Sequence, residues 1–350
     1  MLDYSVIIKL TTRCNLRCEY CNVEEKGGMD FPIEDVDCLI DWLDYTESSD
    51  KCSVLWHGGE PLLLGYDYFD RLFTSQSRYP NRFINSISTN GILIDDKLIN
   101  LFLANDVTIK TSLDSLETSY DQQRNFSSQK VLSTLYKLKE YDYKNIYVRT
   151  TVSKYNQKHL FDIYRFMHTE FDFIWEFAPI IPAGLKKDEA YALLPDAQIF
   201  NNEVISIFKH WFEFRPIEIP IFTDLIKVNL GFLKTPEISE PRLNVGQDGI
   251  IYRCPLLMGN HEYEIGHFTD KSAFEQYCSL QCIWEKIDKA ECYDCLFNNI
   301  CRLSNCAYLA VSLSGMAEIP DYYCQLWKPI YREIRTTVNL ATCAAKIHDC

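Results

Sequence analysis

The sequence predicts an α/β protein in which a partial (β/α)6 barrel is followed by a small cysteine-rich domain. In the first half of the chain, β-rich runs alternate with amphipathic helical patterns, which is typical of a parallel sheet with right-handed crossovers. The 15 cysteines fall into two groups, five within the first 52 residues and ten from Cys254 onward. The two halves of the chain therefore differ in architecture.

The elements of the barrel follow from the hydrophobic period of each segment. Strands are expected over residues 4–10, 53–57, 84–89, 107–113, 146–152 and 173–178. Helices are expected over residues 32–46, 66–78, 95–104, 129–141 and 157–170. In a barrel of this kind, the chemistry gathers where strands end and loops begin.

The second half divides into a bridge and a cysteine-rich part. We place the barrel core at 1–180, the bridging segment at 181–242, the auxiliary domain at 243–326, and a C-terminal helix and tail at 327–350. The bridge is expected to hold a helix around 198–213, followed by short β-like pieces near Pro216, Pro220, Pro236 and Pro241. Asp248-Gly249 predicts a hairpin turn, and a further helix is expected near 327–340.

Composition excludes several function classes. The chain has 350 residues, of which 47% are hydrophobic, and a formal net charge of −14. That charge argues against nucleic acid or an anionic membrane as a partner, and no apolar run is long enough to span a bilayer. The N-terminus has no export signal, and the long middle of the chain has no cysteine. We therefore expect a reduced, cytoplasmic chain with metal sites at two places.

Three cysteines near the start, Cys14, Cys18 and Cys21, have the spacing Cys-x3-Cys-x2-Cys. A cubane iron–sulfur cluster takes four thiolates, so three protein ligands leave one iron open for another molecule. Three ligands within eight residues and without a nearby His are unusual for structural zinc. A structural metal knuckle is the alternative interpretation.

With Tyr20 directly before its third cysteine, this motif resembles that of the radical S-adenosylmethionine (radical SAM) superfamily. The resemblance implies a TIM-like partial barrel and a [4Fe-4S] cluster whose open iron chelates S-adenosylmethionine. It also implies reductive cleavage of that cofactor to a 5'-deoxyadenosyl radical, which abstracts hydrogen from a substrate.

Residues at the strand ends match further parts of the cofactor site in that superfamily. The resemblance implies that the Gly-Gly-Glu-Pro turn meets the amino group of S-adenosylmethionine, and that Ser112 and Arg124 hold its carboxylate. An Arg fork suits a carboxylate. The turns are also compatible with ordinary structural roles. The cofactor-binding candidates are Tyr20, Gly58, Gly59, Glu60, Ser88, Asn90, Ser112 and Arg124.

The general base is not identified by any motif. A charge inside a strand that helices cover must face the lumen or carry a desolvation cost, so charged strand residues are candidates. Arg149 and Glu176 are equally compatible with simply pairing with each other. The catalytic candidates are Lys110, Asp114, Arg149 and Glu176.

The C-terminal region resembles the SPASM (or twitch-like) domain of peptide-maturing radical enzymes. The resemblance implies one complete auxiliary [4Fe-4S] cluster on Cys292, Cys295, Cys301 and Cys324. A second auxiliary cluster would have Cys254, which follows Gly249 in a Gly-x4-Cys element, and Cys306, which is displaced by one residue from the family spacing. Cys278 and Cys282 are its substitute ligands or buried thiols. Zinc also suits tetrathiolate sites.

The resemblance implies radical modification of a ribosomally made (RiPP) precursor peptide, with a ring-forming crosslink as the expected outcome. Flavodoxin or ferredoxin is the expected reductant. The chain begins about ten residues before the cysteine loop, so we expect the peptide to be held by the barrel, the bridge or a separate protein.

Three rival functions remain. Anaerobic sulfatase-maturing enzymes, which form formylglycine, carry an acidic base directly after the cysteine that matches Cys254, where this chain has Pro255. A non-catalytic iron–sulfur scaffold or sensor would not need a cofactor clamp. A small-molecule dehydrogenase with a trimmed auxiliary domain is the last.

Overall fold

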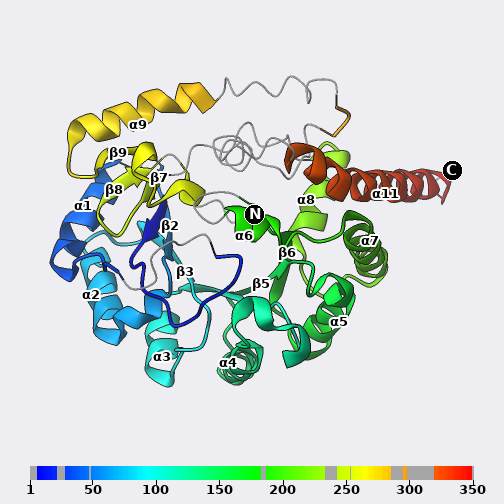
Figure 1. The fold of residues 1–350 in the computed structure, drawn as a ribbon, viewed down its shortest axis with the longest axis horizontal. Helices are drawn as coiled ribbons and strands as arrows, with labels where there is room; N and C mark the ends of the chain where they lie inside the picture. The colour runs from blue at the N-terminus through cyan, green and yellow to red at the C-terminus, as the bar shows by residue number, and fades with distance from the viewer. Residues whose placement is uncertain are drawn as a thin grey trace.

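The computed structural model describes residues 6–21, 28–46, 49–182, 187–232, 243–252, 254–284, 295–297 and 319–348. The six strands expected in the first half are present within two residues of their expected ends: β1 Val6–Lys9, β2 Cys52–His57, β3 Phe83–Ser88, β4 Thr108–Ser112, β5 Ile146–Val152 and β6 Ile174–Pro179. They pair in parallel in the order β6-β5-β4-β3-β2-β1. The α/β prediction is confirmed, and the sheet forms an open partial barrel (Figure 1).

Five helices cover the outer face of this sheet (Figure 1). They are α1 Val36–Thr46, α2 Tyr66–Gln76, α3 Asp96–Ala104, α4 Ser128–Glu140 and α5 Leu160–Glu170. In α1, the apolar residues Val36, Leu39, Ile40 and Leu43 recur at helical spacing and are fully buried. A 3-10 turn precedes both α1 and α5, so these two helices begin later than the sequence predicts.

The two faces of the sheet alternate along each strand. In β5, Ile146, Val148 and Val152 are fully buried and belong to the core that contains the helices. The residues between them, such as Tyr147 and Arg149, are more exposed. Since the helices occupy the first face, the second face lines the lumen.

Three further strands extend the sheet beyond β1. β7 Leu243–Val245 runs parallel to β1, and β8 Ile250–Tyr252 and β9 Glu264–His267 follow antiparallel. Gly249 lies in the turn between β7 and β8 with φ +77°, a conformation that favours glycine. The predicted hairpin is confirmed, and it continues the barrel sheet.

The bridge differs in one place from the prediction. It contains α6 Lys187–Tyr191, α7 Ala197–Phe214 and α8 Pro220–Asn229. The expectation of a β-like piece at Pro220 is wrong, because Pro220 opens a helix that buries Phe222 and Leu225, while Pro216 lies between α7 and α8. Proline suits the first helical position, where its missing N–H costs nothing. Pro236 and Pro241 lie outside the described residues.

Two helices of the C-terminal part are described. α9 Lys271–Trp284 packs on β9, and α11 Ile319–His348 packs on α7 and α8 (Figure 1). α11 is longer than the predicted helix at 327–340 and starts before Cys324. Its Trp327 stacks parallel to Phe177 of β6, which joins the end of the chain to the barrel.

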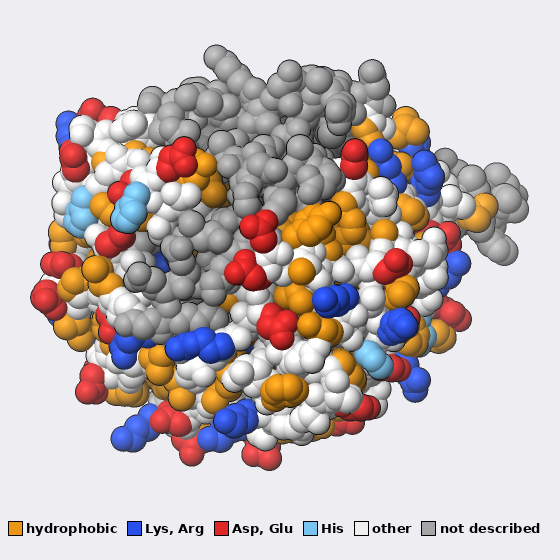
Figure 2. Space-filling model, viewed as in Figure 1, with side chains coloured by type: hydrophobic (Ala, Val, Ile, Leu, Met, Phe, Trp, Pro, Cys, Tyr) orange, Lys and Arg blue, Asp and Glu red, His pale blue; other side chains and the backbone are white. Residues whose placement is uncertain are grey.

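The surface carries charges of both signs. On the face shown in Figure 2, acidic and basic side chains of the described residues are interspersed with hydrophobic ones. None of the described helices combines the length and the apolar character needed to cross a membrane.

Candidate functional site

The loop that holds the three N-terminal cysteines leaves the carboxyl end of β1 and is closed at its neck. The backbone N–H of Phe31 donates to Leu10 at 2.8 Å, and that of Thr12 donates to Met29 at 3.1 Å. Asp30 accepts from the Thr11 hydroxyl at 2.6 Å and from Arg13 Nε at 2.8 Å. These contacts fix the segment that leads into Cys14.

The cysteines themselves are arranged as separate ligands. Cys14, Cys18 and Cys21 are partly exposed, and none of them forms a disulfide. Among the described residues, no three Cys, His, Asp or Glu side chains converge on a point that would hold a single metal ion. A cubane cluster binds each thiolate at a different iron, so the three sulfurs need not converge. Three thiolates on one short loop fit such a cluster.

The turn after β2 packs directly against this loop. The N–H groups of Gly59 and Glu60 donate to the carbonyls of Thr11 and Arg13 at 2.7 and 2.8 Å. A Cβ on Gly58 would lie 2.5 Å from the Thr11 carbonyl oxygen, and one on Gly59 would lie 2.3 Å from that of Arg13. The glycines are therefore needed for the approach of two backbones. Their predicted contact with a cofactor stays a prediction.

Glu60 is fully buried and its carboxylate is well supplied with donors. It accepts from the Leu62 N–H at 3.0 Å, the Thr89 hydroxyl at 2.7 Å and the Asn90 N–H at 2.7 Å. Burial raises the pKa of Glu60 against these hydrogen bonds. Asn90 also donates through Nδ2 to Asn15 Oδ1 at 2.7 Å, so the end of β3 holds the loop through Glu60 and Asn90. Ser88 is the last residue of β3 and is partly exposed.

A buried polar network joins the loop to β4. The Tyr20 hydroxyl donates to Asp114 at 2.7 Å, and Arg124 Nη1 donates to the same hydroxyl at 2.8 Å. Asp114 also accepts from Gln123 Nε2 at 2.8 Å and from the Thr151 N–H at 2.7 Å. Burial raises the pKa of the Asp114 carboxyl, which the Arg124 guanidinium partly opposes. This geometry favours a positioning role for Asp114.

Arg124 has donor capacity left over. It is only 7% exposed, and its Nε has no hydrogen-bond partner in the described structure. An orphaned buried donor is costly unless a ligand satisfies it. Ser112 ends β4 on the partly exposed face. Arg124 thus fits the carboxylate of S-adenosylmethionine, as the sequence predicts, with Tyr20 as its link to the cysteine loop.

Three catalytic candidates lie on the inner face of neighbouring strands. In the register of the sheet, Ser112 of β4 pairs with Arg149 of β5, and Arg149 pairs with Glu176 of β6. Arg149 Nη1 lies 3.7 Å from Glu176 Oε1, so the ion pair that the sequence left open is present. Lys110 lies on the same face of β4, with Nζ 4.8 Å from the centre of the Tyr147 ring. Contact with cofactor or substrate stays a prediction for all three.

Two luminal residues were not identified from the sequence. Lys9 and His57 are register partners on β1 and β2. Burial lowers the pKa of Lys9 to about 8 and that of His57 to about 4. Lys9 donates weakly to the Met258 carbonyl at 3.4 Å. Both are polar residues inside a β-run, the signal that selected Arg149 and Glu176, so the same criterion could have found them.

The auxiliary cysteines are only partly described. Cys254 is fully buried. Phe297 contacts Tyr331 of α11 with ring centres 5.7 Å apart, so the segment of Cys295 lies against the helix that carries Cys324. Cys278 and Cys282 lie on α9. Cys292, Cys301 and Cys306 lie outside the described residues.

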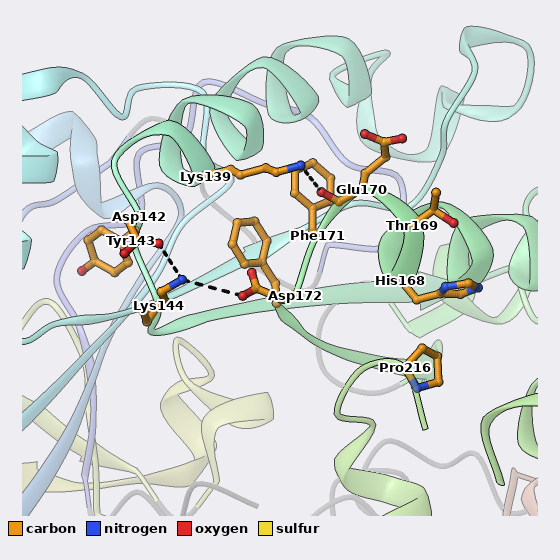
Figure 3. A pocket seen from close by; sticks show the side chains of 11 residues that line it. Lys139, Asp142, Tyr143, Lys144, His168, Thr169, Glu170, Phe171, Asp172 and Pro216 are labelled. Atoms are coloured by element: carbon orange, nitrogen blue, oxygen red, sulfur yellow. Dashed lines mark hydrogen bonds and ion pairs between the residues drawn. The ribbon is translucent and has the colours of Figure 1, made fainter. Parts of the chain in front are cut away.

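A surface hollow of about 480 Å³ lies at the end of the barrel where the strands begin, away from the cysteine loop. Figure 3 shows the residues that line it. It is lined by residues that precede β5 and β6, among them Lys144 and Asp172. The Lys144 ammonium lies 2.5 Å from Asp142 and 3.7 Å from Asp172, so the positive charge of Lys144 is compensated. The cysteine loop lies at the carboxyl ends of the strands, as do Ser112 and Arg124, the residues predicted to hold the cofactor carboxylate. This hollow is therefore separate from the candidate site.

Comparison with known families agrees with this geometry. A sequence model described as the Radical SAM superfamily matches residues 8–167, the stretch that contains the cysteine loop, Glu60, Asp114 and Arg124. The chain therefore contains a radical SAM domain and is an enzyme.

Comparison with individual proteins indicates which radical SAM enzymes this chain is similar to. The chain is 26% identical over 333 residues to the cysteine-type anaerobic sulfatase-maturating enzyme of Clostridium novyi (strain NT), covering 86% of this chain and 87% of that enzyme. Its fold matches native anSMEcpe with bound AdoMet at a TM-score of 0.73 and 19% identity, over 96% and 99% of the two chains. SuiB of Streptococcus suis, bound to S-adenosylmethionine, matches at 0.63 and 14%, over 87% and 73%. Structures of these two proteins also exist with the Cp18Cys peptide and the precursor peptide SuiA.

The predicted superfamily is thus confirmed. The chain is a radical SAM enzyme related to sulfatase-maturing enzymes and to radical SAM peptide maturases.

Proposed function

We propose that this enzyme modifies a residue of a ribosomally made precursor peptide by radical chemistry and closes a crosslink within it. The observation that carries the proposal is the junction at Tyr20. The hydroxyl of Tyr20, the residue directly before Cys21, donates a hydrogen bond to Asp114 and accepts one from Arg124. The Nε atom of Arg124 has no hydrogen-bond partner among the described residues. A cluster and a cofactor that carries a carboxylate can bind side by side when the loop that holds the cluster contacts a buried cation. The Tyr20 hydroxyl makes this contact with Arg124.

The chemistry is divided between the bound groups and the protein. When bound, S-adenosylmethionine and a reduced [4Fe-4S] cluster supply the 5'-deoxyadenosyl radical that abstracts hydrogen. In this chain, Cys14, Cys18 and Cys21 provide the thiolates, while Arg124 and Ser112 orient the methionine end. The protein's remaining task is to place one carbon–hydrogen bond of the substrate in reach of the radical.

The rest of the assignment concerns the C-terminal half. We assign residues 243–326 to an auxiliary domain with one or two [4Fe-4S] clusters, the first on Cys292, Cys295, Cys301 and Cys324. Such a cluster would take up the electron left after hydrogen loss. Flavodoxin or ferredoxin, in a reducing cytoplasm, is the proposed electron donor. The peptide complexes of anSMEcpe and SuiB support a peptide as the substrate.

Two measurements test the proposal. Replacing Cys14, Cys18 and Cys21 together by Ala should abolish reductive formation of 5'-deoxyadenosine in anaerobically reconstituted protein. Persistence of that product in the triple variant would exclude the radical mechanism. Peptides encoded beside this chain's reading frame are the substrate candidates, and mass spectrometry should show the loss of two hydrogen atoms with no change in the backbone.

Formation of formylglycine on a sulfatase is the second candidate. It is favoured by the similarity to the Clostridium novyi enzyme over most of both chains. Against it, the residue after Cys254 is Pro255, which opens a short 3-10 helix and offers no acidic side chain as the base. Conversion of a sulfatase-derived cysteine peptide to an aldehyde product would establish this alternative.

A further inference from the structure

The luminal face of the sheet carries an apolar cluster beside Lys9 and His57, and a group of charged residues on other strands. Near β1, β2 and β8, the buried side chains of Ile7, Leu55, Tyr252 and Met258 form one cluster, separate from the main core. Across β4, β5 and β6, the inner face instead carries Lys110, Arg149 and Glu176. A substrate in the lumen therefore meets two surfaces of different chemistry.

Arg149 has the more open position of the two cations. Its side chain is 53% exposed although it lies on the inner face of β5, between β4 and the edge strand β6. Its only ion pair among the described residues is with Glu176, at 3.7 Å. That distance is longer than a hydrogen bond, and a guanidinium has five N–H donors in a planar fork. The pair therefore leaves donors of Arg149 directed into the lumen.

Lys110 adds a second positive charge beside it. Lys110 and Arg149 lie two residues apart in the register, because Lys110 pairs with Tyr147 and Ser112 pairs with Arg149. The Lys110 ammonium is held over the Tyr147 ring at 4.8 Å, a cation–π contact that keeps it on this face. Lys110 and Arg149 thus place two positive charges on one part of the inner face, where Glu176 pairs with Arg149 and the charge of Glu218 also acts on Tyr147.

We propose that Arg149, with Lys110 beside it, binds a carboxylate group of the substrate. The group would be an Asp or Glu side chain, or a free C-terminus, close to the residue that is modified. An apolar neighbour of that residue would lie on the Ile7–Met258 cluster. This inference rests on the proposed peptide-modifying function and specifies the substrate class. Glu176 orients Arg149 in the absence of substrate and competes with the incoming carboxylate.

The same chemistry could serve the carboxylate of S-adenosylmethionine, since Arg149 pairs with Ser112 in the register. The two sources are separated by measuring cofactor and peptide binding independently. The probes are S-adenosylmethionine and two random peptide pools that are identical except for Glu or Gln fixed at the centre.

In the reconstituted enzyme, we expect the Glu pool to be retained at least about tenfold more strongly than the Gln pool, as one charge-assisted hydrogen bond would give. Arg149→Gln should abolish this preference and leave S-adenosylmethionine affinity unchanged. Arg165→Gln, which removes the same charge from the exposed face of α5, should change neither. Glu176→Gln should strengthen retention of the Glu pool, a gain that a misfolded variant could not show.

Other outcomes would overturn the proposal. Weaker S-adenosylmethionine binding in Arg149→Gln would assign the cation to the cofactor. Retention of both pools without preference would show that Arg149 reads no carboxylate. If neither pool is retained, the peptide function itself fails, and titration with glutarate decides the subsite. Binding of glutarate that depends on Arg149 would support it, and no binding would refute it.

Discussion

Replacing Gly59 by alanine tests how far the cluster loop depends on its contact with the turn after β2. A Cβ at this position would lie 2.3 Å from the carbonyl oxygen of Arg13 and 2.8 Å from that of Thr12. Both are backbone atoms, so no side-chain rotation can relieve the overlap. Either the turn or the loop must move, and Cys14 follows Arg13 directly.

The expected cost has two parts. Overpacking of a close contact typically costs about 1–3 kcal/mol. Separation of the two backbones also weakens the hydrogen bonds from the Gly59 and Glu60 N–H groups, at 2.7 and 2.8 Å, each worth about 1 kcal/mol. We therefore expect Gly59→Ala to lower the free energy of unfolding by about 2–4 kcal/mol and to lose iron at the N-terminal cluster.

The assay combines iron content after anaerobic reconstitution with the midpoint of denaturant unfolding. Gly65→Ala is the matched control, because Gly65 has φ +80° but a Cβ added there would meet no atom of the described residues within 4 Å. It should lose about 1–2 kcal/mol through backbone strain and keep its iron. The reasoning is refuted if Gly59→Ala retains wild-type iron and stability, or if Gly65→Ala loses the same iron.

Three further predictions follow from the site. Arg124→Lys keeps the charge but loses the planar fork, so equilibrium dialysis should show S-adenosylmethionine binding weakened by about 1–3 kcal/mol; unchanged affinity would leave Arg124 as a partner of Tyr20 alone. Burial lowers the pKa of His57 from 6.5 to about 4, so the unfolded chain binds a proton in that window that the folded chain does not. Stability should fall as the pH falls from about 6.5 to 4, by up to about 3 kcal/mol, and His57→Gln should reduce this loss; parallel pH curves would contradict it. Iron analysis should give about eight irons per chain for one auxiliary cluster and about twelve for two, with the auxiliary share kept when Cys14, Cys18 and Cys21 are replaced; zinc in place of that iron would disprove the auxiliary cluster.

The barrel could be predicted because local pattern and tertiary structure agree there. The residues of β5 alternate between a buried and a more exposed face, and those of α1 repeat at helical spacing, so each segment specifies its own element. At Pro220, the sequence pattern predicts a short β-like piece, whereas this proline begins a helix. The deciding factor is the burial of Phe222 and Leu225 against the rest of the protein, which a local pattern does not contain.

In the candidate site, the predicted cluster ligands could be found from the sequence, whereas the long-range contacts that support them could not. The three cysteines predicted as cluster ligands lie close together in sequence and are predicted from their spacing. The supports are not adjacent: Tyr20 and Arg124 are separated by 104 residues, and Asn15 and Asn90 by 75. Spacing alone cannot reveal that Gln123 bridges Asp114 to β5, because no local rule selects a glutamine for that role.

The distribution of these supports has a mechanistic consequence. The loop is held at Thr11 and Arg13 by the turn after β2, at Asn15 by the end of β3, and at Tyr20 by Asp114 and Arg124 beyond β4. Each of these contacts comes from a different strand end, so the loop is positioned by the sheet as well as by the hydrogen bonds at its own neck. Because Arg124 contacts the loop and also has an unsatisfied donor, binding of a carboxylate there would restrain Tyr20 and the adjacent Cys21. We therefore expect the hydroxyl group of Tyr20 to couple cofactor binding to the geometry of the cluster cysteines, and Tyr20→Phe should weaken cofactor binding and iron retention together.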